Sequence, residues 1–268
     1  MPSFGVAIVA LGAVQGLTVA LPGAGWPRWL WRPAGRGWAL IAPGSIIAVI
    51  AGISALPGVA DGLTWLALIA VPPLAAAALG WAMRGARPAF ALAAVALFAL
   101  AWGLKGHLAG DAAALALTAL SCVTLGRLVA GLAPAILIKA GLIVAAIVDT
   151  TLIVSHQLQG PNSVLNAAAP AAHLPKLQLV AFGPAQMGYG DLFVAGLLGG
   201  VLAIEGRRLG LAALATFAIA SLMDLLFLVT DELPATVPVA LALIAVEGVR
   251  LGGAQRRRDH EAGASCVT

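Results

Sequence analysis

Residues 187–198 read Met-Gly-Tyr-Gly-Asp-Leu-Phe-Val-Ala-Gly-Leu-Leu, and they place Asp191 behind two glycines at the beginning of a long apolar segment. A carboxylate inside a membrane span costs free energy, so an acid in such a place indicates a functional site. A second acid, Asp149, lies in the apolar stretch 145–154. The rest of the chain is interpreted as an arrangement that brings these two carboxylates together.

The composition is that of a membrane protein. Hydrophobic residues make up 61% of the 268 residues and charged residues 10%, and the mean hydropathy is +1.01, which exceeds what a soluble domain carries. Because a spanning helix needs about 20 mostly apolar residues, we expect an all-α polytopic membrane protein with about nine transmembrane helices. The expected spans are 4–21, 38–56, 62–83, 88–104, 111–126, 135–154, 187–205, 209–229 and 234–250.

The basic residues indicate the orientation. With the N-terminus outside and the C-terminus inside, all of the 15 lysine and arginine residues except Lys105 and Lys176 lie on the inner side, which the positive-inside rule favours. The same bias accounts for the pI of 9.7. Tryptophans and arginines interleave at 26–38, around the first inner loop, where the tryptophans are interpreted as interfacial membrane anchors rather than as a surface for single-stranded nucleic acid. We therefore expect a multi-pass protein of the cell membrane, surrounded by lipid, with no nucleic-acid partner.

This topology divides the chain into three parts. Residues 1–134 are expected to form an N-terminal five-helix scaffold, residues 135–251 the catalytic helices six to nine, and residues 252–268 a disordered cytoplasmic tail. The longest outer loop, 155–186, joins helices six and seven. Polar and apolar residues alternate at 173–180 near its end, which predicts a short extended strand.

The predicted depths of the two acids agree. Asp149 lies about five residues, or roughly 7 Å, below the outer end of its helix. If residues 177–183 are extended and the next helix begins between Pro184 and Met187, Asp191 lies roughly 6–10 Å deep. A proline at the helix start and glycines in its first turn favour this choice. Both carboxylates then lie near the outer face, within reach of water.

Two carboxylates at this depth can activate water. When they lie within about 4–6 Å of each other in a partly dry site, they share one proton. The charged member can then accept a proton from water while the neutral member donates one to a carbonyl oxygen. This is amide hydrolysis by general acid–base catalysis, and we expect neither a metal nor another cofactor. Gly188 and Gly190 would let a substrate backbone approach closely.

Gly188-Tyr189-Gly190-Asp191 is a GxGD motif. Together with the upstream membrane aspartate and the nine expected spans, it resembles the presenilin and signal peptide peptidase family of intramembrane aspartyl proteases. That family also carries a Pro-Ala-Leu motif at the start of its ninth span, next to the aspartates, and residues 233–241 are similar to it. In this chain Thr236 replaces the leucine of the motif, one residue is inserted before the second proline, and Val148 replaces the tyrosine that usually precedes the first aspartate.

The resemblance implies a presenilin-like bundle and an aspartic endopeptidase of the signal peptide peptidase branch, which shares the N-out, C-in orientation. Its substrates would be single-span membrane helices or signal peptides, and an unwound substrate would pair with the strand expected at 176–181. Tyr189 would either hydrogen-bond the two acids or pack against the loop. The implied catalytic residues are Asp149 and Asp191, and the implied substrate-binding residues are Gly188, Tyr189, Gly190, Pro234, Ala235 and Pro238.

Two other functions fit part of the pattern. Prepilin peptidases also carry a GxGD motif, but they usually have a lysine where this chain has Phe193, have fewer spans, and carry N-terminal cysteine motifs that this sequence lacks. Proton-coupled transporters also use membrane acids, and a third acid, Asp224, lies at a similar depth in the span 209–229. We expect Asp224 either to make a structural hydrogen bond between helices or to be a snorkelling residue at the end of its span. The sequence leaves the substrate and the oligomeric state open.

Overall fold

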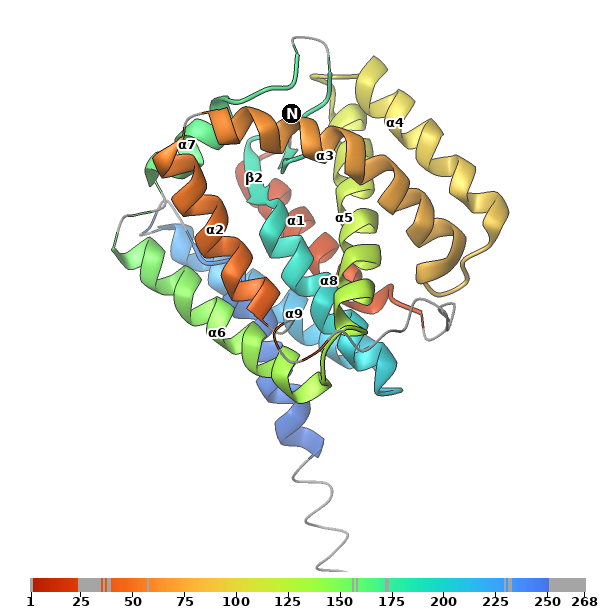
Figure 1. The fold of residues 1–268 in the computed structure, drawn as a ribbon, viewed down its shortest axis with the longest axis vertical. Helices are drawn as coiled ribbons and strands as arrows, with labels where there is room; N and C mark the ends of the chain where they lie inside the picture. Colours follow the sequence, from red (N-terminus) through yellow and green to blue (C-terminus); the bar gives the residue numbers. More distant parts are fainter. Residues whose placement is uncertain are drawn as a thin grey trace, which may run out of the picture.

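The helix that carries Asp191 is the central element of the fold. The computed structural model describes residues 2–23, 35, 37, 40–56, 58–155, 157, 159–171, 174–228, 230 and 233–250. Helix α8 (Tyr189–Ile204) is buried continuously from Leu192 to Ala203. It packs against α1 (Phe4–Ala20), α5 (Leu108–Ala130), α6 (Ala135–Val154) and α9 (Leu209–Met223). Figure 1 shows α8 running beside α5 through the middle of the bundle.

The remaining elements surround this group, and the expected all-α class is confirmed. Helix α3 continues into a single π-helical segment, and 3-10 turns lead into α4 and continue α9. The chain is helical again at 237–250, after the last gap in the described residues. The other elements are α2 (Ile41–Ala55), α3 (Gly58–Ala77), the π segment Ala78–Ala82, the 3-10 turn Pro88–Leu92, α4 (Ala93–Gly103), α7 (Gln159–Ala167), β1 (Leu179–Phe182), β2 (Ala185–Gly188) and the 3-10 turn Asp224–Leu228.

The prediction of nine spanning helices is wrong, although a helix is found at each of the nine predicted apolar runs. Within the described residues, four helices are long and apolar enough to cross a membrane: Gly58–Ala82, Leu108–Ala130, Ala135–Val154 and Leu209–Phe227. The apolar helices Phe4–Ala20, Ile41–Ala55, Pro88–Gly103 and Tyr189–Ile204 are shorter. At 16 residues, α8 is only about 24 Å long, whereas the hydrocarbon core is about 30 Å thick.

The helix α8 begins at Tyr189 because the residues before it form a β-hairpin. Strands β1 and β2 pair antiparallel, with Leu179 opposite Gly188 and Phe182 opposite Ala185. The two-residue turn between them begins with Gly183, whose φ is +58°, a value that glycine adopts without strain. The predicted strand at 173–180 overlaps β1, whereas its partner β2 occupies residues at which a helix was predicted to begin. The hairpin packs against α5 and α1.

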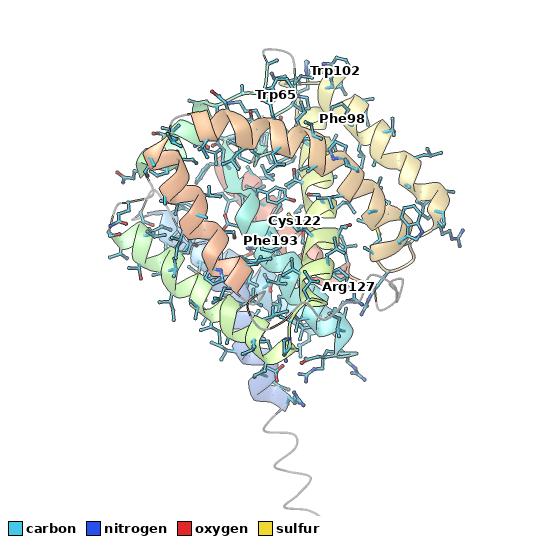
Figure 2. All side chains as sticks on the ribbon, viewed as in Figure 1. Trp65, Phe98, Trp102, Cys122, Arg127 and Phe193 are labelled. Atoms are coloured by element: carbon cyan, nitrogen blue, oxygen red, sulfur yellow. The ribbon has the colours of Figure 1, made fainter. Side chains whose placement is uncertain are left out.

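Polar contacts gather at the two opposite ends of the bundle. At one end, the Lys139 ammonium group on α6 lies 2.7 Å from carboxylate oxygens of both Glu205 and Glu247, and the Arg127 Nε donates to the carbonyl of Gly23. At the hairpin end, Lys176 donates to the carbonyl of Asn166. Figure 2 shows Arg127 far from Trp65 and Trp102, which lie near the hairpin end. The tail 252–268 lies outside the described residues.

Glycines bring α8 into backbone contact with its neighbours. A Cβ on Gly196 would overlap the backbone of Cys122 on α5, and a Cβ on Gly126 would overlap the backbone of Gly196. A Cβ on Gly199 would overlap the carbonyl of Val19 on α1. Small residues at helix interfaces allow this close approach within membranes. The position of α8, and with it the position of Asp191, therefore depends on these glycines.

We predict that Gly196→Ala lowers the stability of the protein by at least about 1–3 kcal/mol, the usual cost of overpacking. The added Cβ has to push α8 away from the α5 backbone. The matched control is Gly210→Ala on α9, where a Cβ meets nothing within 4 Å, so stability should be retained or slightly raised by the better helix propensity of alanine. Thermal unfolding in detergent measures both variants, and equal melting temperatures for them would contradict the interface.

Candidate active site

Asp191 lies in the first turn of α8, directly after the hairpin. Its Oδ2 accepts a hydrogen bond of 3.1 Å from the backbone N–H of Gly188, the N-cap residue of the helix. A negative charge in this place is favoured by the partial positive charge of the helix N-terminus. Asp191 is the third residue of α8, shallower than expected, because β2 occupies the residues at which the helix was predicted to begin.

Asp149 lies five residues before the end of α6, at Val154. Helix α6 packs against α8, and Asp149 and Asp191 lie close enough for their charges to interact. Both residues are partly buried. The structure therefore brings together the two acids that were chosen from the sequence.

The segment that precedes the last helix also meets Asp149. The Thr236 hydroxyl donates a hydrogen bond of 2.6 Å to Oδ2 of Asp149. Thr236 is only 2% exposed, and its carbonyl accepts the first hydrogen bond of the helix 237–250, from Ala240 at 3.2 Å. Thr236 therefore occupies the N-cap position of that helix, and the N-terminus of the helix lies beside the Asp149 carboxylate.

The neighbours of Thr236 lie with it beside Asp149. The carbonyl of Pro234 accepts a hydrogen bond from Val237 at 3.1 Å, which closes a turn at 234–237. Pro234 and Ala235 are partly buried, and Pro238 is buried in the first turn of the helix, where its missing N–H costs nothing. The segment that resembles the Pro-Ala-Leu motif thus lies next to one of the two acids.

Gln15 on α1 is a residue of this site that was not chosen from the sequence. Its Nε2 donates a hydrogen bond of 2.7 Å to the carbonyl of Ala235, and its side chain is fully buried. The partner lies 220 positions away in the chain, so no local pattern could predict the contact. The available signal was the single amide side chain of the apolar first helix, where an unpaired polar group would be costly.

The Tyr189 hydroxyl bonds to α5 and not to either acid. It lies 3.0 Å from Oγ of Ser121 on α5. Since the Ser121 hydroxyl donates to the carbonyl of Thr118 at 2.7 Å, the tyrosine is the donor of the pair. The tyrosine is also packed against the buried core. Of the two roles considered for Tyr189, packing is the one that the structure contains.

The two glycines of the motif leave the hairpin end open. Gly188 and Gly190 are both exposed, and a Cβ on Gly190 would meet nothing within 4 Å. A Cβ on Gly188 would lie 3.1 Å from Oδ2 of Asp191, close enough to disturb this carboxylate. A substrate backbone could therefore approach Asp191 along the glycines.

Asp224 lies at the end of α9, next to α1. It begins the 3-10 turn that continues α9 and faces Gly12 of α1. Its Oδ2 is buried and has no hydrogen-bond partner among the described residues. The structural hydrogen bond expected for Asp224 is not found at this oxygen.

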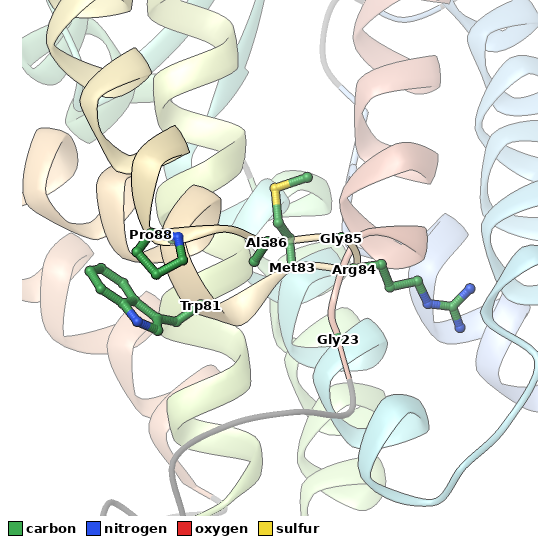
Figure 3. Close-up of a pocket in the computed structure, with 8 residues that line it drawn as sticks. Gly23, Trp81, Met83, Arg84, Gly85, Ala86 and Pro88 are labelled. Carbon is green, nitrogen blue, oxygen red and sulfur yellow. The ribbon is translucent and has the colours of Figure 1, made fainter.

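A cavity of about 500 Å³ lies away from the acids, at the connection between α3 and α4 (Figure 3). None of the residues that line it was chosen from the sequence as part of the site. The lining residues of the cavity are Gly23, Gly80, Trp81, Met83, Arg84, Gly85, Ala86 and Pro88.

Across the part of the chain that the structure describes, no three histidine, cysteine, aspartate or glutamate residues are grouped to hold a metal ion.

No family model matches this sequence, and neither a curated protein nor a solved structure is significantly similar to it. The resemblance to presenilins and signal peptide peptidases is carried by three features: the GxGD motif, the upstream Asp149 and the segment 233–241.

We predict that Tyr189→Phe lowers the free energy of unfolding by about 1 kcal/mol, the net value of one hydrogen bond. Because the hydroxyl points to α5, the acids should be unaffected. The control is Ser121→Ala, which removes the partner of the same bond and leaves the tyrosine oxygen unsatisfied, so it should cost at least as much. Thermal unfolding in detergent measures both. An unchanged stability for Tyr189→Phe would show that the hydroxyl is not bound to Ser121.

Proposed function

We propose that the protein is an intramembrane aspartyl protease, in which Asp149 and Asp191 activate the water that hydrolyses a peptide bond. The observation that carries this proposal is the placement of these two carboxylates on helices that pack together, one near the end of α6 and one in the first turn of α8. Both are partly buried in a bundle whose long helices are apolar enough to cross a membrane. Acids in such surroundings are retained when they have a function.

The reaction needs one charged and one neutral carboxyl group. The charged member accepts a proton from water as the water oxygen bonds to the carbonyl carbon, and the neutral member donates its proton to the carbonyl oxygen. In the resulting tetrahedral diol, the C–N bond breaks when the amine nitrogen receives a proton and a diol hydroxyl loses one to a carboxylate. Water and the peptide are the only reactants, and the two aspartates end as they began.

The surroundings of the acids suit an extended peptide. Strand β2 leads directly into the turn that carries Asp191, and an extended chain can add to a strand by main-chain hydrogen bonds. Gly188 and Gly190 leave room for the approach of a backbone. Pro234, Ala235 and Pro238 would border the same cleft beside Asp149. We propose single-span membrane helices or signal peptides as substrates, in a membrane orientation with the N-terminus outside and the C-terminus inside.

Asp224 supports a second candidate, a proton-coupled transporter. Its buried and unpartnered oxygen lies between α9 and α1, and membrane acids of this kind also serve proton relays. The two functions predict opposite effects at this residue. A protease tolerates Asp224→Asn, whereas a transporter loses its coupling.

We predict that Asp149→Asn and Asp191→Asn each reduce peptide cleavage by at least about 100-fold, because general acid–base catalysis contributes about 10²–10⁴. The measurement is cleavage of a panel of single-span helices by the purified protein in liposomes. The matched control is Asp224→Asn, which removes the same charge outside the dyad and should keep wild-type activity. An aspartyl transition-state mimic should block the wild-type protein.

Three results of this assay would contradict the proposal. Cleavage that persists in either dyad variant would exclude a two-aspartate mechanism. Cleavage confined to the short basic leader of a pilin-like substrate would indicate a prepilin peptidase. An absence of any cleavage, together with proton-dependent solute uptake that needs Asp224, would indicate a transporter.

A further inference from the structure

We propose that Thr236 is the positioning residue of Asp149: its hydroxyl holds one oxygen of that carboxylate and fixes Asp149 as the charged member of the pair, and Gln15 fixes Thr236 in turn. This inference rests on the proposed protease function. Thr236 stands at the position where the Pro-Ala-Leu motif has a leucine, and the proposal gives a role to its hydroxyl.

The Thr236 hydrogen bond has the geometry of a strong one. Its length of 2.6 Å lies within the range of about 2.5–2.7 Å for a hydroxyl that donates to an ionised carboxylate. Thr236 is 2% exposed, so water does not compete for the hydroxyl. The branched Cβ of threonine restricts its rotamers, and the donor is therefore held ready at low entropic cost.

The backbone around Thr236 adds to the same effect. As the N-cap residue, Thr236 brings the N-terminus of the helix 237–250 to Asp149, and the partial positive charge of a helix N-terminus stabilises an anion. Asp149 needs this support because it lies near the C-terminal end of α6, where the dipole of its own helix disfavours a negative charge.

The two acids differ in their donors. Asp149 accepts a bond of 2.6 Å from a buried hydroxyl, whereas Asp191 accepts a bond of 3.1 Å from an exposed backbone N–H. The shorter bond, from the better-desolvated donor, favours the charged form more strongly. Asp149 is therefore the base that takes the proton of water, and Asp191 is the acid that protonates the carbonyl oxygen.

Gln15 connects α1 to this arrangement. Its 2.7 Å bond to the Ala235 carbonyl fixes the peptide group directly before Thr236. The other polar atom of its side chain, Oε1, is buried without a hydrogen-bond partner among the described residues, a condition that costs free energy. Burial of the Gln15 amide thus costs free energy at Oε1. The hydrogen bond that the amide makes at Nε2 is the one that holds the backbone before Thr236.

The test compares three threonine variants in the liposome cleavage assay. Thr236→Val keeps the shape but removes the donor, so kcat should fall by about 10- to 100-fold, the value of a hydrogen bond to a charged group, with little change in KM. Thr236→Ser keeps the hydroxyl and should retain kcat within about threefold of wild type. The matched control is Thr216→Val, which removes a fully buried hydroxyl bonded to the Ala212 carbonyl on α9 and should leave kcat unchanged.

Gln15→Met tests the second half of the proposal. The variant keeps the length of the side chain and removes the amide, so kcat should fall less than in Thr236→Val. Because both residues act on one carboxylate, the double variant should be no slower than Thr236→Val alone. A double variant slower by the product of the two single effects would overturn the assignment of Gln15.

A wild-type level of kcat in Thr236→Val would overturn the proposal, and so would a loss that Thr236→Ser fails to rescue.

A stability measurement tests the contact even if the protein cleaves no substrate. Thr236→Val should lower the melting temperature of the wild type, and by less in an Asp149→Ala background, where the acceptor is gone. Equal losses in both backgrounds would overturn the contact itself, whereas the proposed function is judged on the dyad variants alone.

Discussion

Direct backbone contact between α5 and α8 is the constraint on which the rest of the structure depends. Apolar side chains gain nothing by leaving lipid for a protein interior, so helices associate in a membrane through close packing. Gly126 and Gly196 provide this packing because neither has a Cβ to separate the two helices. The helix α8 is consequently enclosed over its whole middle, and the turn that carries Asp191 begins at a fixed point beside α1 and α6.

The second constraint is that each of two acids in an apolar bundle needs a source of positive potential. Asp191 finds it in the first turn of its own helix, where the Gly188 N–H caps it. Asp149 lies near the end of α6, where a helix offers the opposite potential, and it meets the start of the helix 237–250 instead. The proposed site is therefore a meeting of two helix N-termini, one that carries Asp191 and one that faces Asp149 from the neighbouring helix.

The sequence predicted those parts of the fold that depend on local composition. The apolar runs predicted the positions of the helices, because a helix in apolar surroundings needs apolar residues along its own length. Acids are rare in such runs, and this rarity pointed to Asp149 and Asp191. The span count was wrong because turns decide where helices end, and composition does not show them. At α8, for example, β2 takes up Met187 and Gly188, which had been assigned to a span. The contact between Gln15 and Ala235 could not be predicted, because it depends on packing between the two ends of the chain. Thr236 was noticed only as a departure from a motif, since its partner is visible only in three dimensions.

The three elements that carry the site are also tied together at their other ends. The Lys139 ammonium group on α6 bonds to Glu205, directly after α8, and to Glu247 in the helix 237–250. These are the elements that hold Asp149, Asp191 and Thr236 at the hairpin end. A largely buried ion pair contributes little net stability but does select one arrangement, because moving one partner leaves a charge uncompensated. A shift of α6 along α8 would break the contacts at Lys139. The relative position of the helices that carry the two aspartates is therefore held at both ends of the bundle.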